Sequence, residues 1–197
     1  DSGLANNGYG LFLGNNDGRF RGDIDGANKI SSDAGEITDA EWFHIAWTWD
    51  GSTHKLYKNG SVVKTASSGS TPPSDTTNMR KGSWNHSTER EFKGYIGQTA
   101  IWNKELSSTE VGAIYTLGRH GNLLDSYSDN LIGYWAMSAL DAKTGLSDVG
   151  DGTIYDRSGN SNHGTATNTE SADLKSSPNA QPEGYAKQDV NRSTTTP

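Results

Sequence analysis

Residues 42–66 constrain the fold more than any other segment, because short apolar stretches alternate there with two tight-turn dipeptides, Asp50-Gly51 and Asn59-Gly60. Asn-Gly favours a type I′ turn, since both residues tolerate a positive φ angle. Within residues 42–49 both alternating sets of side chains include large apolar groups, which is typical of a strand in the middle of a sandwich. The segment therefore predicts three consecutive antiparallel strands, over residues 42–49, 54–58 and 61–65.

Further strands are predicted on both sides of this segment. Residues 9–24 form an apolar–turn–apolar pattern with Asp17-Gly18 at the turn, which predicts a β-hairpin. Residues 92–102 alternate with period two, and residues 131–137 are strongly apolar, so each predicts one more strand.

One helix is predicted. Ser107 and Glu110 have the spacing of a capping box, in which the Ser side chain accepts from the amide three residues on and the Glu side chain reaches back. A short helix near 107–117 should follow and end at Gly118. The predicted fold class is all-β: an antiparallel β-sandwich with this one short helix.

Composition agrees with short strands and many turns. Only 31% of the 197 residues are hydrophobic, and 24 are Gly. The net charge of −7 argues against a nucleic-acid partner, which needs basic patches. There is no Cys, which excludes a disulfide and a thiol nucleophile. No apolar run reaches the roughly 20 residues that a membrane-spanning helix needs.

The last part of the chain differs from the rest. Residues 166–197 are polar and hold few sizeable apolar side chains, so this tail should not order alone in water. We expect a domain over residues 1–165 and an extended tail over 166–197 that neighbouring subunits order.

The strand segments carry a family resemblance. Glu41–Ala46, Trp49–Gly60 and Gly94–Ser107 resemble, in order and spacing, the middle and last strands of laminin-G-like (LamG) domains. The resemblance covers roughly residues 9–175 and implies a concanavalin A-like jelly roll. It also implies that strands normally found before the 9–24 hairpin are missing. Either they lie outside this sequence, or Leu131–Met137 fills the gap, or another chain completes the sheet. An open sandwich of this kind would expose apolar faces and strand edges, which are sites of association.

A second resemblance concerns the order of segments. Leu131–Met137 and Tyr155–Thr165 are similar to a segment that opens many LamG-like domains, but here it follows the last strand. This order resembles LamG-like structural proteins of tailed phages and marine viruses. It implies a location on a virion surface or outside the cell, with other copies of the chain or other virion proteins as partners.

Catalysis is not expected. Glycosidases of this fold class carry a Glu-x-Asp-x-x-Glu strand motif, which is absent. Glu89 and Glu91 could share one strand face, but a solvated strand end explains them as well. No Gly-x-Ser-x-Gly nucleophile motif is present.

Calcium is the cofactor that the sequence leaves open. Asp17, Asp23 and Asp25 form an oxygen-rich stretch of the kind that calcium prefers, and Asp148, Asp151 and Asp156 form a second one. For both sets the favoured interpretation is that these residues are turn formers.

Trp84, Asn85 and His86 are the predicted ligand-binding residues. Trp84 lies in a polar stretch and could stack on a sugar ring or a partner, whereas the tryptophans at 47, 49, 102 and 135 lie in strand patterns and should pack inside. His44 should also serve packing. Arg21-Gly22-Asp23 matches the integrin tripeptide, but three-residue matches arise often by chance.

Three functions remain in competition. The first is a non-catalytic virion or surface structural module, such as a capsid decoration, head fibre or tail-associated protein, that self-assembles. The second is a carbohydrate-binding module of a secreted or cell-surface protein, which rests on fold analogy. A glycosidase is ranked last.

Overall fold

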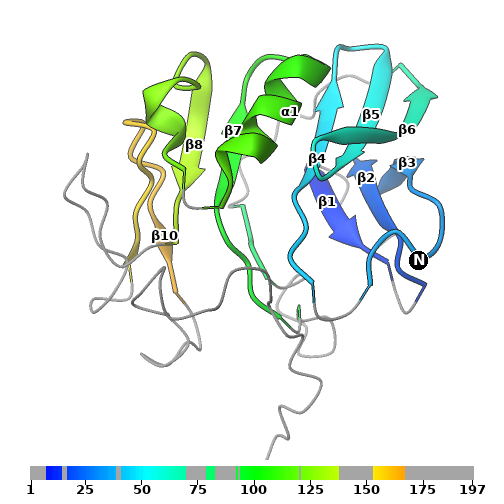
Figure 1. The fold of residues 1–197 in the computed structure, drawn as a ribbon, viewed down its shortest axis with the longest axis horizontal. Helices are drawn as coiled ribbons and strands as arrows, with labels where there is room; N and C mark the ends of the chain where they lie inside the picture. The colour runs from blue at the N-terminus through cyan, green and yellow to red at the C-terminus, as the bar shows by residue number, and fades with distance from the viewer. Residues whose placement is uncertain are drawn as a thin grey trace, which may run out of the picture. The chain divides into compact units, whose positions relative to one another are not determined.

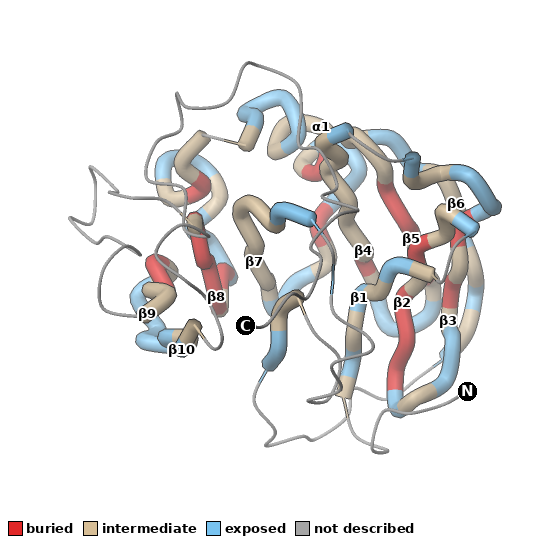
Figure 2. Tube along the Cα trace, turned by 90° about the horizontal axis from the view of Figure 1, so that it is seen from below, coloured by how far each residue is buried: buried red, intermediate tan, exposed pale blue. Residues whose placement is uncertain are grey.

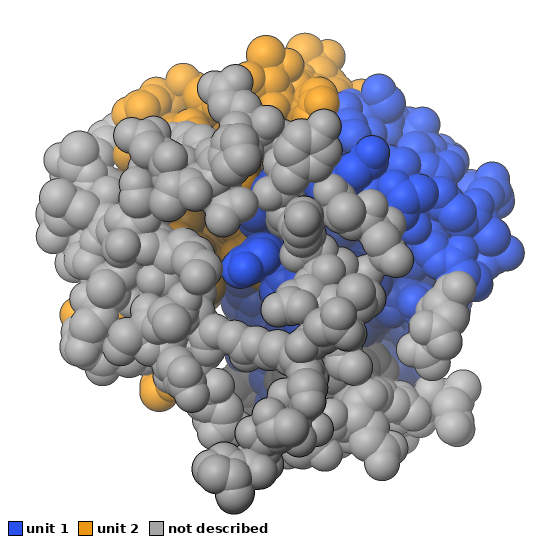
Figure 3. All heavy atoms as spheres, turned by 60° about the horizontal axis from the view of Figure 1, so that its bottom comes forward, with its two compact units in different colours: residues 1–95, 186–197 blue, residues 96–185 orange. Residues whose placement is uncertain are grey.

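The computed structural model describes residues 8–14, 17–38, 41–69, 79–82, 92, 94–119, 121–137 and 153–166. The chain divides into two compact units, one of residues 1–95 with 186–197 and one of residues 96–185 (Figure 3). The described elements are antiparallel strands with one α-helix and one short 3₁₀ turn (Figure 1). The predicted all-β fold class is therefore confirmed.

The first sheet has the order β1-β2-β3 and consists of β1 (Tyr9–Leu13), β2 (Phe20–Ile24) and β3 (Ala27–Ser31). The predicted hairpin is confirmed, because β1 and β2 pair in antiparallel register. Asp25 and Gly26 make the next turn with φ angles of 51° and 71°, a left-handed pair that fits a type I′ turn.

The second sheet has the order β4-β5-β6, with β4 (Ile45–Trp49), β5 (Thr53–Lys58) and β6 (Ser61–Ser67). All three predicted strands are present, although β4 starts three residues later than expected. Asn59 and Gly60 have φ angles of 49° and 79°, so the predicted type I′ turn is confirmed. The Asn59 side chain also accepts from the His44 N–H at 3.0 Å, which ties the turn to the segment before β4.

The two sheets of the first unit pack face to face around a buried cluster of Phe20, Ile30 and Leu56. Ile45 and Trp47 pack against this cluster from β4. Buried positions run along β2 and β5 in Figure 2. This is the sandwich that the alternation predicted.

The second unit pairs β7 (Thr99–Trp102) with β8 (Leu131–Trp135), and a small ladder joins β9 (Thr153–Ile154) to β10 (Gly164–Thr165). Its core holds Leu123, Leu131, Tyr134 and Ala136, and Leu123 lies in the 3₁₀ turn η1 (Leu123–Asp125). The strand predicted over 92–102 is shorter than expected, since among the described residues of this segment only those of β7 pair. Two glycines at positions 94 and 97 explain the difference, because Gly weakens a strand.

The helix α1 (Ser108–Leu117) confirms the capping-box prediction. Ser107 accepts from the Glu110 N–H at 3.2 Å, and the Glu110 carboxylate accepts from the Ser107 N–H at 2.7 Å. Gly118 follows the helix with a φ angle of 77°. Among the described residues, no helix is long and apolar enough to cross a membrane.

Candidate recognition and assembly site

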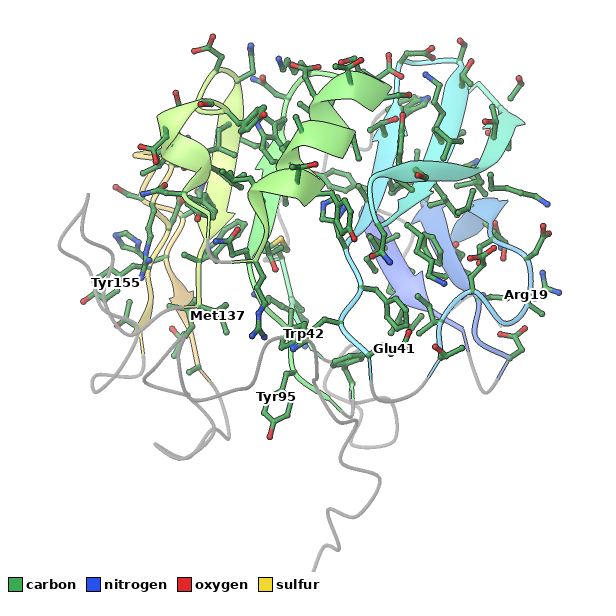
Figure 4. The ribbon with its side chains drawn as sticks, viewed as in Figure 1. Arg19, Glu41, Trp42, Tyr95, Met137 and Tyr155 are labelled. Carbon is green, nitrogen blue, oxygen red and sulfur yellow. The ribbon has the colours of Figure 1, made fainter. Side chains whose placement is uncertain are left out.

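The predicted ligand-binding residues Trp84, Asn85 and His86 lie outside the described residues, as do Glu89 and Glu91. Two aromatic residues close in sequence are described. Phe92 and Tyr95 are each 40% exposed, and Figure 4 shows the Tyr95 ring projecting outward. Phe92 and Tyr95 are therefore exposed aromatic rings that lie close in sequence to the predicted ligand segment.

The structure does not bring Asp17 together with Asp23 and Asp25. Asp17 precedes β2 and Asp25 follows it, and the five residues of β2 span roughly 16 Å. Oxygens on one calcium ion lie within about 5 Å of each other, since each is 2.3–2.6 Å from the metal. Among the described residues, no group of three or more His, Asp or Glu side chains could hold a metal ion.

Each of these three acids has a local partner. The Asp17 carboxylate accepts from the Arg19 guanidinium at 2.9 Å, at the β1–β2 connection where Figure 4 labels Arg19. The Asp25 carboxylate accepts from the Gly8 N–H at 3.2 Å, and Asp23 pairs with Arg21. These contacts match the role of turn formers for Asp17 and Asp25.

The Arg21-Gly22-Asp23 tripeptide lies inside β2 rather than in an exposed loop. Asp23 is 3% exposed and forms an ion pair with Arg21, with 3.2 Å between Nε and Oδ2. Burial raises the pKa of the Asp23 carboxyl, and the nearby Arg21 guanidinium opposes that rise. Because the Asp23 carboxylate is buried, a partner protein could not bind it in the way that it binds a tripeptide in an exposed loop.

Asp156, from the second acidic set, is a structural carboxylate. It is 3% exposed and accepts from the N–H groups of Tyr134, Ser158 and Asn162 at 2.9 Å each, and from the Ser158 hydroxyl. Burial alone would raise its pKa, but these hydrogen bonds outweigh burial and hold the pKa below its usual value. Its oxygens are thus occupied by the protein. Asp148 and Asp151 lie outside the described residues.

The loop that follows Asp156 is attached to β8 by side chains. The Asn160 amide donates to the Leu131 carbonyl at 3.0 Å, and the Asn162 amide donates to the Ile132 carbonyl at 2.8 Å. The Trp135 indole N–H donates back to the Asn162 carbonyl at 2.9 Å. These hydrogen bonds therefore hold the polar loop after Asp156, which resembles LamG-like sequences, against β8.

The strand tryptophans use their indole groups inside the protein. Trp102 donates to the Tyr127 carbonyl at 2.9 Å, and Trp47 donates to His54 Nδ1 at 3.3 Å. None of the tryptophans at 47, 49, 102 and 135 is exposed. These contacts agree with the expected packing role.

His54 is a residue that sequence reasoning missed. It is fully buried and lies between Trp47 and Trp49 on one face of the β4–β5 hairpin. The Asp50-Gly51 turn sets Trp49 opposite His54, so the register of this hairpin is the feature that could have predicted their contact. His44 is half-buried, and burial lowers its pKa.

The largest apolar side chains exposed on a strand of the first sheet lie together on β1. Tyr9, Leu11 and Leu13 are 57%, 38% and 37% exposed. Leu13 pairs with Phe20 in β2, whose side chain is in the core, so these three side chains lie on the core side of the sheet. We call them the β1 patch. These side chains are partly exposed at the edge of the sandwich.

One solved structure shares limited similarity with this chain. A crystal structure of an S-layer domain-containing protein from Clostridium thermocellum aligns with a TM-score of 0.36 and 27% sequence identity, over 58% of this chain and 59% of that one. The chain thus spans less than two thirds of that structure, and a TM-score this low carries no argument. No curated protein matches the chain significantly.

A family model supplies the stronger comparison. The model for the concanavalin A-like lectin/glucanases superfamily, of laminin-G type, matches residues 2–112, more than half of the chain. The match includes both sheets of the first unit and reaches into α1. It agrees with the face-to-face antiparallel sheets described above. This chain belongs to the concanavalin A-like lectin/glucanases superfamily.

Proposed function

We propose that this protein is a non-catalytic structural module of a virion or cell surface that assembles with copies of itself. The β1 patch carries the proposal. Exposed apolar side chains that lie together often mark a surface that contacts another protein. The net charge of −7 keeps the rest of the surface soluble.

The absence of catalysis is supported by the acidic residues. The sequence lacks the Glu-x-Asp-x-x-Glu motif, and the buried carboxylates of Asp23 and Asp156 are engaged in an ion pair or in hydrogen bonds. A glycosidase needs two carboxyl groups about 5–10 Å apart that face a sugar. The placement on a virion rests on the order of the LamG-like segments.

Sedimentation of the full chain at several concentrations tests the proposal. Self-assembly predicts a mean mass that rises above 21.2 kDa as concentration increases. Residues 1–10 and 166–197 are proposed to contribute subunit contacts, so limited proteolysis should remove them more slowly from the assembled form. A chain that stays monomeric at all concentrations contradicts the proposal.

Carbohydrate binding is the second candidate. The superfamily name includes lectins, and Phe92 and Tyr95 are exposed rings close in sequence to the predicted residues Trp84, Asn85 and His86. An aromatic ring can pack against the C–H face of a pyranose. Such stacking does not require a calcium ion bound by Asp17, Asp23 and Asp25.

A glycan array with and without calcium tests this candidate. Binding that is lost in Trp84→Ala or Tyr95→Ala, but kept in Tyr115→Ala, supports it. Tyr115 is a suitable control because it is 45% exposed on α1, away in sequence from the ligand segment. No binding to any glycan under either condition argues against it.

A further inference from the structure

Strand β1 lies at one edge of the first sheet, and its backbone orientation follows from the bonds at its two ends. Asp25 N–H donates to the Gly8 carbonyl at 2.8 Å, and Gly14 N–H donates to the Arg19 carbonyl at 2.6 Å. In an antiparallel pair, residues that bond to the neighbouring strand alternate with residues that do not. The even-numbered residues of β1 therefore bond to β2, and the odd-numbered ones direct their N–H and C=O groups away from it.

These odd-numbered residues are Tyr9, Leu11 and Leu13, the β1 patch. The same three residues thus present both unused backbone groups and exposed apolar side chains. Among the described residues, no strand pairs with this edge. A surface that offers a row of donors and acceptors beside apolar side chains is shaped for an added β-strand.

The edge lacks the usual protection against pairing. Native sheets protect free edges with charges, proline or bulges. Strand β3 carries Lys29 and a register shift, and β6 carries Lys64 and a register shift. Strand β1 has the sequence Tyr-Gly-Leu-Phe-Leu, in unbroken register with β2. Strand β4 is also uncharged, but none of its residues is exposed.

We propose that β1 pairs antiparallel with β1 of a second copy, with Leu11 opposite the partner's Leu11. This inference rests on the proposed self-assembly and specifies its contact. The pairing joins two first sheets into one continuous six-stranded sheet, since each contributes three strands. It places Tyr9 opposite the partner's Leu13, an aromatic–aliphatic pair of the kind that stabilises adjacent strands.

A second copy is favoured as the occupant because β1 is complementary to itself. Tyr9, Leu11 and Leu13, whose backbone groups face away from β2, form three hydrogen-bonded pairs with an antiparallel copy, centred on Leu11. No charge lies on the strand, so no like charges oppose each other within the two paired β1 strands.

Charge substitution at Leu11, which lies opposite itself at the centre of the proposed strand pair, gives the sharpest test. Leu11→Lys and Leu11→Glu should each weaken self-association of the full chain, because like charges then lie directly opposite each other. An equimolar mixture of the two variants should associate again, as a heterodimer. Sedimentation equilibrium should give a dimer dissociation constant raised about tenfold or more for each variant alone. Circular dichroism checks that both variants fold.

Proline provides an independent test of the backbone bonds. The Leu11 N–H faces away from β2, so Leu11→Pro removes a donor from the proposed contact and none from the internal ladder. It should raise the dissociation constant about tenfold. Val62→Lys is the matched control, because Val62 is a 43% exposed strand residue on β6. It should leave association unchanged.

The outcomes separate the two proposals. A wild-type chain that never associates overturns the self-assembly proposal and the contact together. Association that persists in all Leu11 variants, or that Val62→Lys abolishes equally, overturns the β1 contact and leaves self-assembly standing. A mixture of Lys and Glu variants that stays monomeric overturns the register about Leu11.

Discussion

The imidazole of His54 stacks on the indole of Trp49, with ring centroids 5.6 Å apart and planes inclined by 9°. His54 Nδ1 accepts the Trp47 indole N–H at 3.3 Å, and Nε2 lies 3.2 Å from the Ser68 carbonyl. An acceptor role for Nδ1 and a donor role for Nε2 require the neutral ring. The packed state of this hairpin therefore depends on an uncharged His54.

Acidification should destabilise the protein through His54. Burial lowers the pKa of His54 below its ordinary 6.5, with the Ser68 contact opposing, Lys29 lowering it further and Asp50 raising it. The unfolded chain then binds a proton at a higher pH than the folded one. The stability due to neutral His54 is complete above pH 6.5 and is lost as pH falls towards the folded pKa. If the folded and unfolded pKa values of a group differ by one, its contribution is about 1.4 kcal/mol.

Urea unfolding at about pH 7.5 and about pH 5.5, on either side of the ordinary histidine pKa, measures this effect. His54→Gln cannot titrate but keeps an acceptor and a donor, so it should reduce the difference between the two free energies of unfolding. His44→Gln is the matched comparison, because burial lowers the pKa of His44 as well. An unchanged pH dependence in His54→Gln would contradict the assigned role.

Asp156 should be essential for the stability of the β8 loop. Asp156→Ala leaves the buried N–H group of Tyr134 and the less buried N–H groups of Ser158 and Asn162 without their acceptor, and we expect a loss of about 1–3 kcal/mol. Asp156→Asn keeps one acceptor oxygen and should lose less. Chemical unfolding followed by circular dichroism measures both.

The control for Asp156 is Asp129→Ala, which removes the same charge from an exposed turn. It should change the free energy of unfolding by less than about 0.5 kcal/mol. Because hydrogen bonds hold the Asp156 pKa below its usual 3.8, its contribution is present above that pH and is lost as pH falls through the folded pKa. Equal losses in Asp156→Ala and Asp129→Ala would disprove the structural role.

The capping box predicts a smaller, local effect. Ser107→Ala removes the acceptor of the Glu110 N–H and should cost about 1 kcal/mol. Hydrogen bonds from Lys104 and Ser107 lower the Glu110 pKa to about 2, so the stabilisation is present at neutral pH and declines as pH falls below 4.5. Thr109→Ala, in the same exposed turn, is the control. Thermal unfolding that responds equally to both substitutions would contradict the prediction.

Local turn chemistry determines how much of the fold can be predicted. Asn59-Gly60 and the Ser107–Glu110 pair each set a conformation through their own atoms, so their elements are predictable. Strand β3 is missed, because Ile30 is its only large apolar residue and tertiary packing, not pattern, makes it a strand. The oxygen-rich stretch that contains Asp17, Asp23 and Asp25 suggests a calcium site. The spacing of these residues along the sequence does not show that strand β2 holds Asp17 and Asp25 apart.

The candidate site is less predictable than the fold. The sequence Tyr9–Leu13 does not by itself show whether the apolar face of this strand is covered or exposed. Only the pairing with β2, together with exposure, identifies which backbone groups are free. The burial of His54 requires a hairpin register that composition does not supply.

Gly22 should be intolerant of any side chain, because β2 lies close to Trp47 of the facing sheet. A Cβ atom on Gly22 would come 2.6 Å from the indole ring of Trp47. Gly22→Ala therefore forces the two sheets apart or moves Trp47 off its rotamer, at a cost of about 1–3 kcal/mol. Gly69→Ala is the matched control, since nothing lies within 4 Å of its Cβ position. Tryptophan fluorescence and urea unfolding should change for Gly22→Ala alone, and a variant as stable as wild type would refute the close approach of β2 to β4.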